Sequence, residues 1–255
     1  MNTPDFGELD RILRGYRLGV LAEELVEAMV GAGHQDALEL VAELFEREDE
    51  ARLLRRVERL LKASRLGRAK TFETLEMERF EAKLQLKINA LRDGGFAARA
   101  QNVLCFGAPG VGKSHVAQAL GHEMIKQGRR VKLYQTFELV QELLGAKAEL
   151  KLARALRKLD GYEVLIVDDL GYVQQEAGEV EVLFTLMAER YERRSMIITS
   201  NLVFSQWDQI FKNEMTTAAA IDRLVHHAVI LEFNVGSYRS QQALARQRAE
   251  KTRDE

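Results

Sequence analysis

The sequence has few cysteines and prolines and no long apolar run, and each shortage excludes a class of protein. Its only cysteine, Cys105, excludes a disulfide framework or a cysteine-rich zinc site within one chain and favours a reducing cytoplasm. No stretch approaches about 18 consecutive apolar residues, so we expect no membrane span. The first residues lack the basic start and apolar run of a signal peptide. With prolines only at Pro4 and Pro109, long helices can run unbroken.

Charge is nearly balanced over the whole chain but unevenly distributed along it. The net charge is −2, with 30% charged and 46% hydrophobic residues, an ordinary globular mixture. Residues 1–50 contain 13 acidic and 4 basic residues, whereas residues 52–70 contain 8 basic residues and 1 acidic residue. A basic block this one-sided predicts an anionic surface as its partner.

Two patterns of apolar residues divide the chain. Up to about residue 100, apolar residues recur at helical spacing, whereas short apolar runs alternate with helical lengths after it. The five runs are 102–106, 131–135, 164–167, 196–199 and 229–233. They predict βαβ units and a mainly parallel five-stranded sheet with flanking helices. We therefore expect an α/β domain over residues 76–255, preceded by a small all-α domain over residues 1–75.

The strongest motif lies between the first apolar run and the helical pattern after it. It reads Gly107-Ala108-Pro109-Gly110-Val111-Gly112-Lys113-Ser114 and fits the phosphate-binding loop G-x-x-x-x-G-K-[ST] in full. Its glycines let backbone N–H groups cradle phosphates at a helix N-terminus. We expect Lys113 to reach the β- and γ-phosphates of ATP, Ser114 to bind Mg²⁺, and His115 to complete the nucleotide site. A glycine-rich turn without a ligand is the alternative.

Polar residues follow two more of the predicted strands. Asp168 and Asp169 come directly after the run 164–167, and Asn201 follows the run 196–199. Ligands of open α/β sheets bind at the carboxyl ends of strands, so we expect these side chains beside the phosphate loop. Asp168 fits an acid that holds Mg²⁺ through water, and Asp169 fits a base that deprotonates the attacking water. Asn201 fits a partner of the γ-phosphate or of that water, although strand ends and turns also favour such residues.

These motifs in this order resemble those of the AAA+ ATPases, a fold class of P-loop proteins. Over about residues 50–240 the chain is more closely similar to the IstB-like proteins, which are ATP-dependent helpers of insertion-sequence transposases, and to their relatives, the DnaC-type helicase loaders. Three strings carry most of that resemblance: Asp168-Asp169-Leu170-Gly171-Tyr172, Glu189-Arg190-Tyr191-Glu192-Arg193-Arg194-Ser195 and Asp222-Arg223-Leu224-Val225-His226-His227.

The resemblance implies roles that spacing cannot assign. Asn201 matches the first sensor residue, whose strand lies between the P-loop strand and the acidic strand. Arg223 matches the arginine finger that one subunit supplies to its neighbour's site, which implies a homo-oligomer. Arg239 matches a second sensor, although the chain after it is too short for a full AAA+ lid. Asp169 stands where most AAA+ proteins have glutamate and IstB-like proteins commonly have aspartate, so the hydrolysis rate stays open.

Two basic stretches are candidates for binding double-stranded DNA through its phosphates. The first is the block 52–70, and the second lies between the second and third predicted strands. The candidate residues are Arg52, Arg55, Arg56, Arg59, Lys62, Lys147, Lys151 and Arg154. Solvated helix faces are the alternative, and neither stretch carries a motif that reads particular bases.

The sequence favours a helper ATPase that assembles on DNA and assists a cognate transposase, and three alternative functions are compatible with parts of it. A helicase loader of the DnaC type is the first, although the chain lacks the cysteine-histidine zinc module of some loaders. A small-molecule P-loop kinase would have no use for the basic block. A structural DNA-binding protein that uses ATP only as a switch is the third, because Asp169 replaces glutamate.

Overall fold

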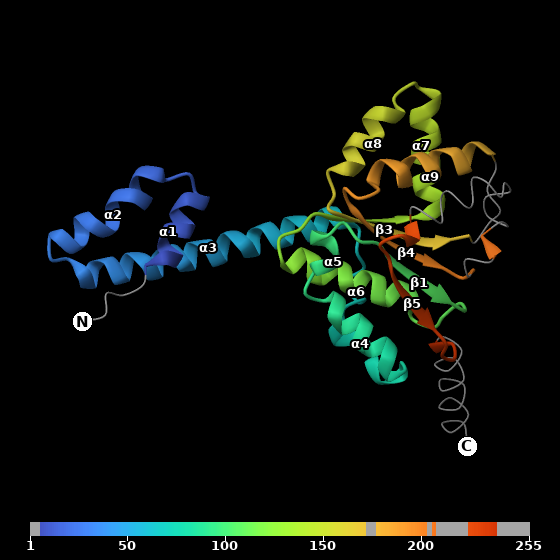
Figure 1. Cartoon of the computed structure of the whole chain (residues 1–255), viewed down its shortest axis with the longest axis horizontal. Helices are drawn as coiled ribbons and strands as arrows, with labels where there is room; N and C mark the ends of the chain where they lie inside the picture. The colour runs from blue at the N-terminus through green and yellow to red at the C-terminus, as the bar shows by residue number, and fades with distance from the viewer. Residues whose placement is uncertain (1–5, 172–176, 203–205, 208–223, 239–255) are drawn as a thin grey trace, which may run out of the picture. The chain divides into compact units, whose positions relative to one another are not determined.

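The computed structural model describes residues 6–171, 177–202, 206–207 and 224–238 (Figure 1). The chain divides into two units, Met1–Arg59 and Leu60–Glu255, which are described separately below. Helix α3, Gln35–Ser64, begins in the first unit and ends in the second, and no proline interrupts its 30 residues. No helix within the described ranges is long and apolar enough to cross a membrane.

The first unit is helical, as predicted. It contains α1 (Gly7–Gly15), α2 (Gly19–Gly31) and the start of α3. Leu9, Leu13 and Leu38 are almost completely buried and form its small core. All residues of this core lie within the first unit, which ends at Arg59.

The second unit is built on the predicted parallel sheet. Its strands are β1 (Val103–Gly107), β2 (Val131–Gln135), β3 (Val164–Leu170), β4 (Ser195–Ser200) and β5 (Val229–Phe233). All pairs are parallel, in the order β2-β3-β4-β1-β5. Strand β4 therefore lies between the P-loop strand and the acidic strand, as the resemblance implied. The other elements are η1 (Phe72–Thr74), η2 (Met77–Arg79), α4 (Ala82–Leu91), α5 (Gly95–Ala98), α6 (Lys113–Lys126), α7 (Thr136–Ala148), α8 (Leu152–Asp160) and α9 (Ala177–Arg190).

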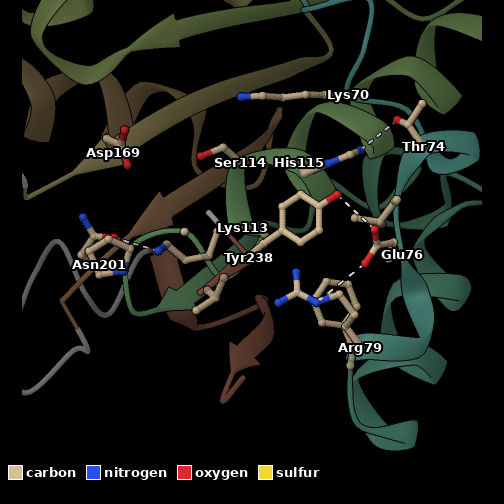
Figure 2. A pocket seen from close by; sticks show the side chains of 16 residues that line it. Lys70, Thr74, Glu76, Arg79, Lys113, Ser114, His115, Asp169, Asn201 and Tyr238 are labelled. Atoms are coloured by element: carbon tan, nitrogen blue, oxygen red, sulfur yellow. Dashed lines mark hydrogen bonds and ion pairs between the residues drawn. The ribbon is translucent and has the colours of Figure 1, made fainter. Parts of the chain in front are cut away.

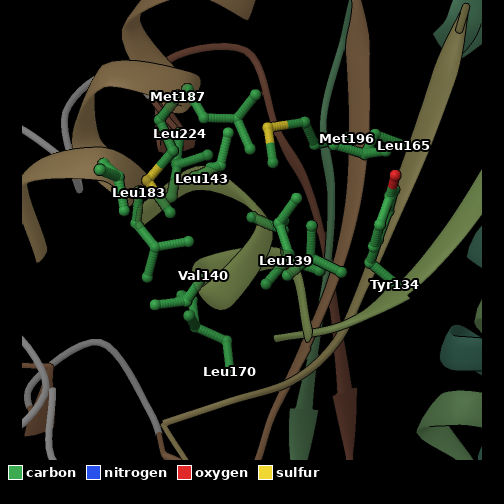
Figure 3. Packing of buried hydrophobic residues seen from close by; sticks show 14 of the residues in the cluster. Tyr134, Leu139, Val140, Leu143, Leu165, Leu170, Leu183, Met187, Met196 and Leu224 are labelled. Atoms are coloured by element: carbon green, nitrogen blue, oxygen red, sulfur yellow. The ribbon is translucent and has the colours of Figure 1, made fainter. Parts of the chain in front are cut away.

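Helices cover both faces of the sheet (Figure 1). On one face, α7 and α9 pack their leucines against alternate residues of the strands, among them Leu165 and Met196 (Figure 3). On the other face lies α6, where the absence of a side chain at Gly121 leaves room for Ile166. Because both faces are covered, the central strands β3 and β4 are buried almost throughout rather than at alternate residues, which is why they contain continuous apolar runs in the sequence.

An irregularity at the end of β3 sets up the site. The pairing of β3 with β4 is shifted between Val167 and Leu170. At this bulge Asp169 has φ +61°, a left-handed conformation that aspartate tolerates better than most residues. The bulge separates the directions of two adjacent carboxylates: Asp168 is buried, whereas Asp169 lines a cavity.

Candidate active site

The phosphate loop connects β1 to α6, as its motif predicted. Gly107 and Gly112 have φ +153° and +112°, and α6 begins at Lys113. A Cβ atom at Gly107 would lie 2.6 Å from the carbonyl oxygen of Phe233, so only glycine fits between the loop and β5. Residues 109–115 line one cavity of about 270 Å³, whose walls Figure 2 shows.

Lys113 joins the phosphate loop to the end of β4. Its buried ammonium donates hydrogen bonds to the carbonyl oxygens of Gly107 and Ala108, at 2.7 and 2.8 Å, and to Oδ1 of Asn201, at 2.7 Å. The P-loop lysine and the predicted sensor are therefore in direct contact. An anionic phosphate in the cavity would compete for the same ammonium, because a charge-assisted bond to an anion is stronger than one to a neutral carbonyl.

The two adjacent acids are held by a residue that the sequence did not single out. The Thr199 hydroxyl donates to Oδ1 of Asp168 at 2.6 Å and accepts from the backbone N–H of Asp169 at 2.9 Å. Thr199 is fully buried in β4, and Asp168 is only 3% exposed. Gln135, at the end of β2, donates to the other Asp168 oxygen at 3.4 Å. One hydroxyl thus orients both carboxylate-bearing residues.

The oxygen atoms at this end of the cavity suit Mg²⁺. Ser114 and Asp169 line the cavity, and the carboxylate of Asp168, the preceding residue, is buried and bonded to Thr199. Hydroxyl and carboxylate oxygens are the hard ligands that Mg²⁺ prefers, and it commonly keeps several waters. The donor set therefore fits the predicted ion, with a buried carboxylate suited to holding it through water.

Segments far from the phosphate loop close the other end of the cavity, and the sequence motifs did not identify them. They contribute Lys70, Thr74, Leu75, Glu76, Arg79, Phe80 and Tyr238. In Figure 2, Thr74, Glu76 and Arg79 lie at the side of the cavity opposite Asp169 and Asn201, with Ser114 and His115 between. Lys70 and Thr74 lie on the N-terminal side of the predicted domain boundary at residue 75.

Tyr238 ties these remote segments to the phosphate loop. Its backbone N–H donates to the carbonyl oxygen of Gly110 at 2.9 Å, and its hydroxyl donates to Glu76 at 3.0 Å. The Arg79 guanidinium lies 4.6 Å from the centre of the Tyr238 ring and donates to the carbonyl oxygen of Gly236 at 2.9 Å. Tyr238 is therefore part of the cavity wall, next to the phosphate loop.

The string around Arg190 has a structural role instead. The Arg190 side chain is 2% exposed and donates to the carbonyl oxygens of Leu159, Tyr162 and Ser195 at 2.9–3.0 Å. Burial lowers the pKa of its guanidinium to about 10. This arginine fixes the ends of α8 and α9 beside the start of β4, away from the cavity. Arg223 and Arg239 lie outside the described residues.

The predicted DNA-binding residues are exposed except Lys147, which is half-buried, and half of the eight form ion pairs. Arg52 and Arg55 both contact Glu48, Lys147 contacts Glu181, and Lys151 contacts Glu149. The other four form no ion pair with any described residue: Arg56, Arg59, Lys62 and Arg154. These four have their full charge available for an anionic partner.

The chain is similar in sequence to ATP-binding proteins of insertion sequences. The family described as IstB-like ATP binding protein matches residues 15–246. An insertion-sequence ATP-binding protein of Sinorhizobium fredii is 42% identical over 250 residues, which cover 97% of this chain and 84% of that protein. The ATP-binding protein of insertion sequence IS21 from Pseudomonas aeruginosa is 36% identical, covering 79% of this chain and 76% of its own.

Solved structures share the fold at low sequence identity. The DnaC helicase loader has a TM-score of 0.51 and is 20% identical, with 60% of this chain and 89% of that chain covered. At that identity the likeness shows the fold alone, which is the AAA+ type of P-loop domain predicted from the sequence.

Proposed function

Because the chain belongs to the IstB-like ATP binding protein family, we propose that it is the ATP-dependent helper of an insertion-sequence transposase. The chain is a P-loop ATPase of the AAA+ type. In this proposal it assembles in the cytoplasm into a homo-oligomer on double-stranded DNA and assists its cognate transposase there. The segment 1–75 contacts DNA or partners, except that Lys70, Thr74 and Leu75 line the nucleotide cavity, and residues 76–255 supply the rest of the ATPase site. The observation that carries the proposal is one cavity shared by Lys113, Ser114, Asp169 and Asn201.

ATP would lie along the cavity between its two ends. The backbone N–H groups at the start of α6 and the Lys113 ammonium would bind the β- and γ-phosphates, which places the base toward Leu75, Phe80 and Tyr238. Apolar and aromatic walls with a few polar groups suit a nucleobase. Ser114 and Asp168 would hold Mg²⁺, which neutralises charge on the phosphate oxygens.

Hydrolysis requires that a water molecule attack the γ-phosphate. Asp169 would orient this water and accept its proton, because its carboxylate lies in the cavity on the strand end next to β4. Asn201 would bind the water or the γ-phosphate. Lys113 would exchange its bond to Asn201 for one to the phosphate, which would free the amide oxygen of Asn201 for that role.

Assembly would couple this chemistry to DNA. Arg223 of one subunit would contact the γ-phosphate in its neighbour's site, where a guanidinium can neutralise developing charge. ATP would then favour the oligomer, and hydrolysis would release it. The two basic stretches would neutralise DNA phosphates, which gives affinity without base readout.

The first test measures ATP turnover and particle size in the same samples, with and without double-stranded DNA. We expect DNA to stimulate turnover, and ATP to drive large DNA-bound assemblies that Lys113→Ala cannot form. A protein that stays small, ignores DNA and turns over ATP only with a small acceptor would instead be a kinase. Stimulation by a transposase rather than a replicative helicase would separate the helper from a loader.

The second test uses three cations of α3 that form no ion pair with a described residue. In the triple variant Arg56→Gln, Arg59→Gln, Lys62→Gln, we expect weaker DNA binding. The salt slope should fall by about 0.9 for each DNA phosphate that the variant no longer neutralises. Arg47→Gln is the matched control, because Arg47 is an exposed arginine of the same helix paired with Glu43. Equal affinity and slope in the triple variant and the wild type would contradict DNA binding through α3.

A further inference from the structure

Lys70 is a cation of the cavity that comes from neither the phosphate loop nor a strand end. Lys70 is the last residue of the basic block 52–70, and its half-buried side chain lines the same cavity as Ser114 and Asp169. Figure 2 shows it extending toward the side of the cavity that holds these two residues. We propose that Lys70 is a second phosphate-binding cation, which contacts the γ-phosphate end of ATP from the segment that follows α3. This inference rests on the proposed binding of ATP.

The backbone before Lys70 is fixed to the phosphate-binding helix. Gln118 of α6 accepts a hydrogen bond from the backbone N–H of Gly67 at 2.9 Å, and His122 of α6 donates to the Gly67 carbonyl oxygen at 3.0 Å. Lys70 itself donates its backbone N–H to the same carbonyl oxygen at 3.3 Å. Gly67, the first residue of this short turn, thus takes part in all three hydrogen bonds.

The backbone after Lys70 is fixed to the same helix. His115 donates from Nε2 to the carbonyl oxygen of Thr71 at 3.0 Å, and Lys126 contacts Glu73 at 3.1 Å. His115, Gln118, His122 and Lys126 therefore form one stripe along α6 that holds residues 67–73. Because Lys70 is anchored on both sides, its ammonium reaches the cavity with little additional ordering, which favours a binding role.

The charge of Lys70 is available for a ligand. Its ammonium forms no hydrogen bond or ion pair with the described residues, whereas the Lys113 ammonium has three partners. Burial lowers the pKa of the His115 imidazole, and the nearby charge of Lys70 lowers it further. A triphosphate would bring negative charge to this spot and give Lys70 a charge-assisted hydrogen bond.

The test compares the affinities of a non-hydrolysable ATP analogue and of ADP, each with Mg²⁺, by titration calorimetry. In Lys70→Gln we expect the affinity for the ATP analogue to fall about tenfold or more, because one charge-assisted bond is lost, while ADP binding changes much less. Lys70→Arg should recover most of the difference. Arg68→Gln is the matched control, because Arg68 is exposed on the same segment and does not line the cavity.

Each outcome separates this inference from the proposed function. A wild-type protein that binds neither nucleotide would contradict ATP binding itself. If the wild type binds the analogue and Lys70→Gln binds it equally well, only the role of Lys70 is refuted. An equal loss in Lys70→Gln and Arg68→Gln would also refute it, because the effect would then come from positive charge in general.

Discussion

Thr199 gives the sharpest test of how the fold prepares the acidic end of the cavity. Its buried hydroxyl bonds Asp168 at 2.6 Å and the backbone N–H of Asp169 at 2.9 Å. Thr199→Val keeps the shape of the side chain and removes only these two bonds. The missing bond to a carboxylate and the buried N–H left without its partner should together cost about 3–5 kcal/mol of unfolding free energy.

The assay is urea unfolding followed by tryptophan fluorescence. The chain has one tryptophan, Trp207, which is fully buried in the same core as α7 and α9, so its emission reports on the second unit alone. Thr199→Ser retains the hydroxyl and should lose only about 1 kcal/mol, the value of one methyl group. We also expect Thr199→Val to need about 10–100-fold more Mg²⁺ for half-maximal ATP turnover, as is typical when a group that orients metal ligands is removed.

The opposite results would refute the reasoning. If Thr199→Val unfolds at the same urea concentration as the wild type, the hydroxyl does not stabilise the two acids. If its stability falls but its Mg²⁺ dependence does not change, Asp168 is structural, and the proposed role of this carboxylate in holding the ion is wrong.

Two further predictions concern buried groups. Arg190→Met should lower the unfolding free energy by about 3 kcal/mol or more, because three buried carbonyl oxygens lose their donor. The control is Arg193→Met, which should change the unfolding free energy by no more than about 1 kcal/mol, because Arg193 is exposed. Equal effects of the two substitutions would contradict a special role for Arg190. Burial raises the pKa of the Cys105 thiol to about 12, so the native thiol should stay protonated at pH 8 and react with a disulfide reagent only through opening of the sheet. An ATP analogue that binds only the folded protein, at about 100 times its Kd, should then slow this reaction by about 100-fold. If the analogue does not change the reaction rate, Cys105 reacts without global unfolding.

The parts of the site predicted from the sequence are those whose signals are local. The phosphate loop is a contiguous motif between a strand and a helix, and Asp168 and Asn201 each follow an apolar run closely. The topology of a parallel sheet then brings these strand ends together, which the contact between Lys113 and Asn201 reflects. The apolar runs themselves identified all five strands, because helices bury both faces of the sheet.

The parts that the sequence did not reveal depend on long-range packing. Glu76 and Tyr238 are 162 positions apart and meet only because β5 and the segment after α3 flank the same loop. Thr199 looks like any β-branched strand residue until the bulge at Asp169 is known. In the sequence, Lys70 looks like any other cation of the block 52–70. Its position relative to α6 is set by contacts of the neighbouring residues 67, 71 and 73 with side chains that lie far along the chain. No periodicity carries such information.

The most direct test of the account is a calorimetric titration of the wild type and Lys113→Ala with the Mg²⁺-bound ATP analogue, with the folding of both checked by Trp207 fluorescence. We predict one binding site per chain in the wild type and no detectable binding in the folded variant. If the folded Lys113→Ala binds the analogue as tightly as the wild type, the nucleotide does not occupy the cavity described here, and the central claim is wrong.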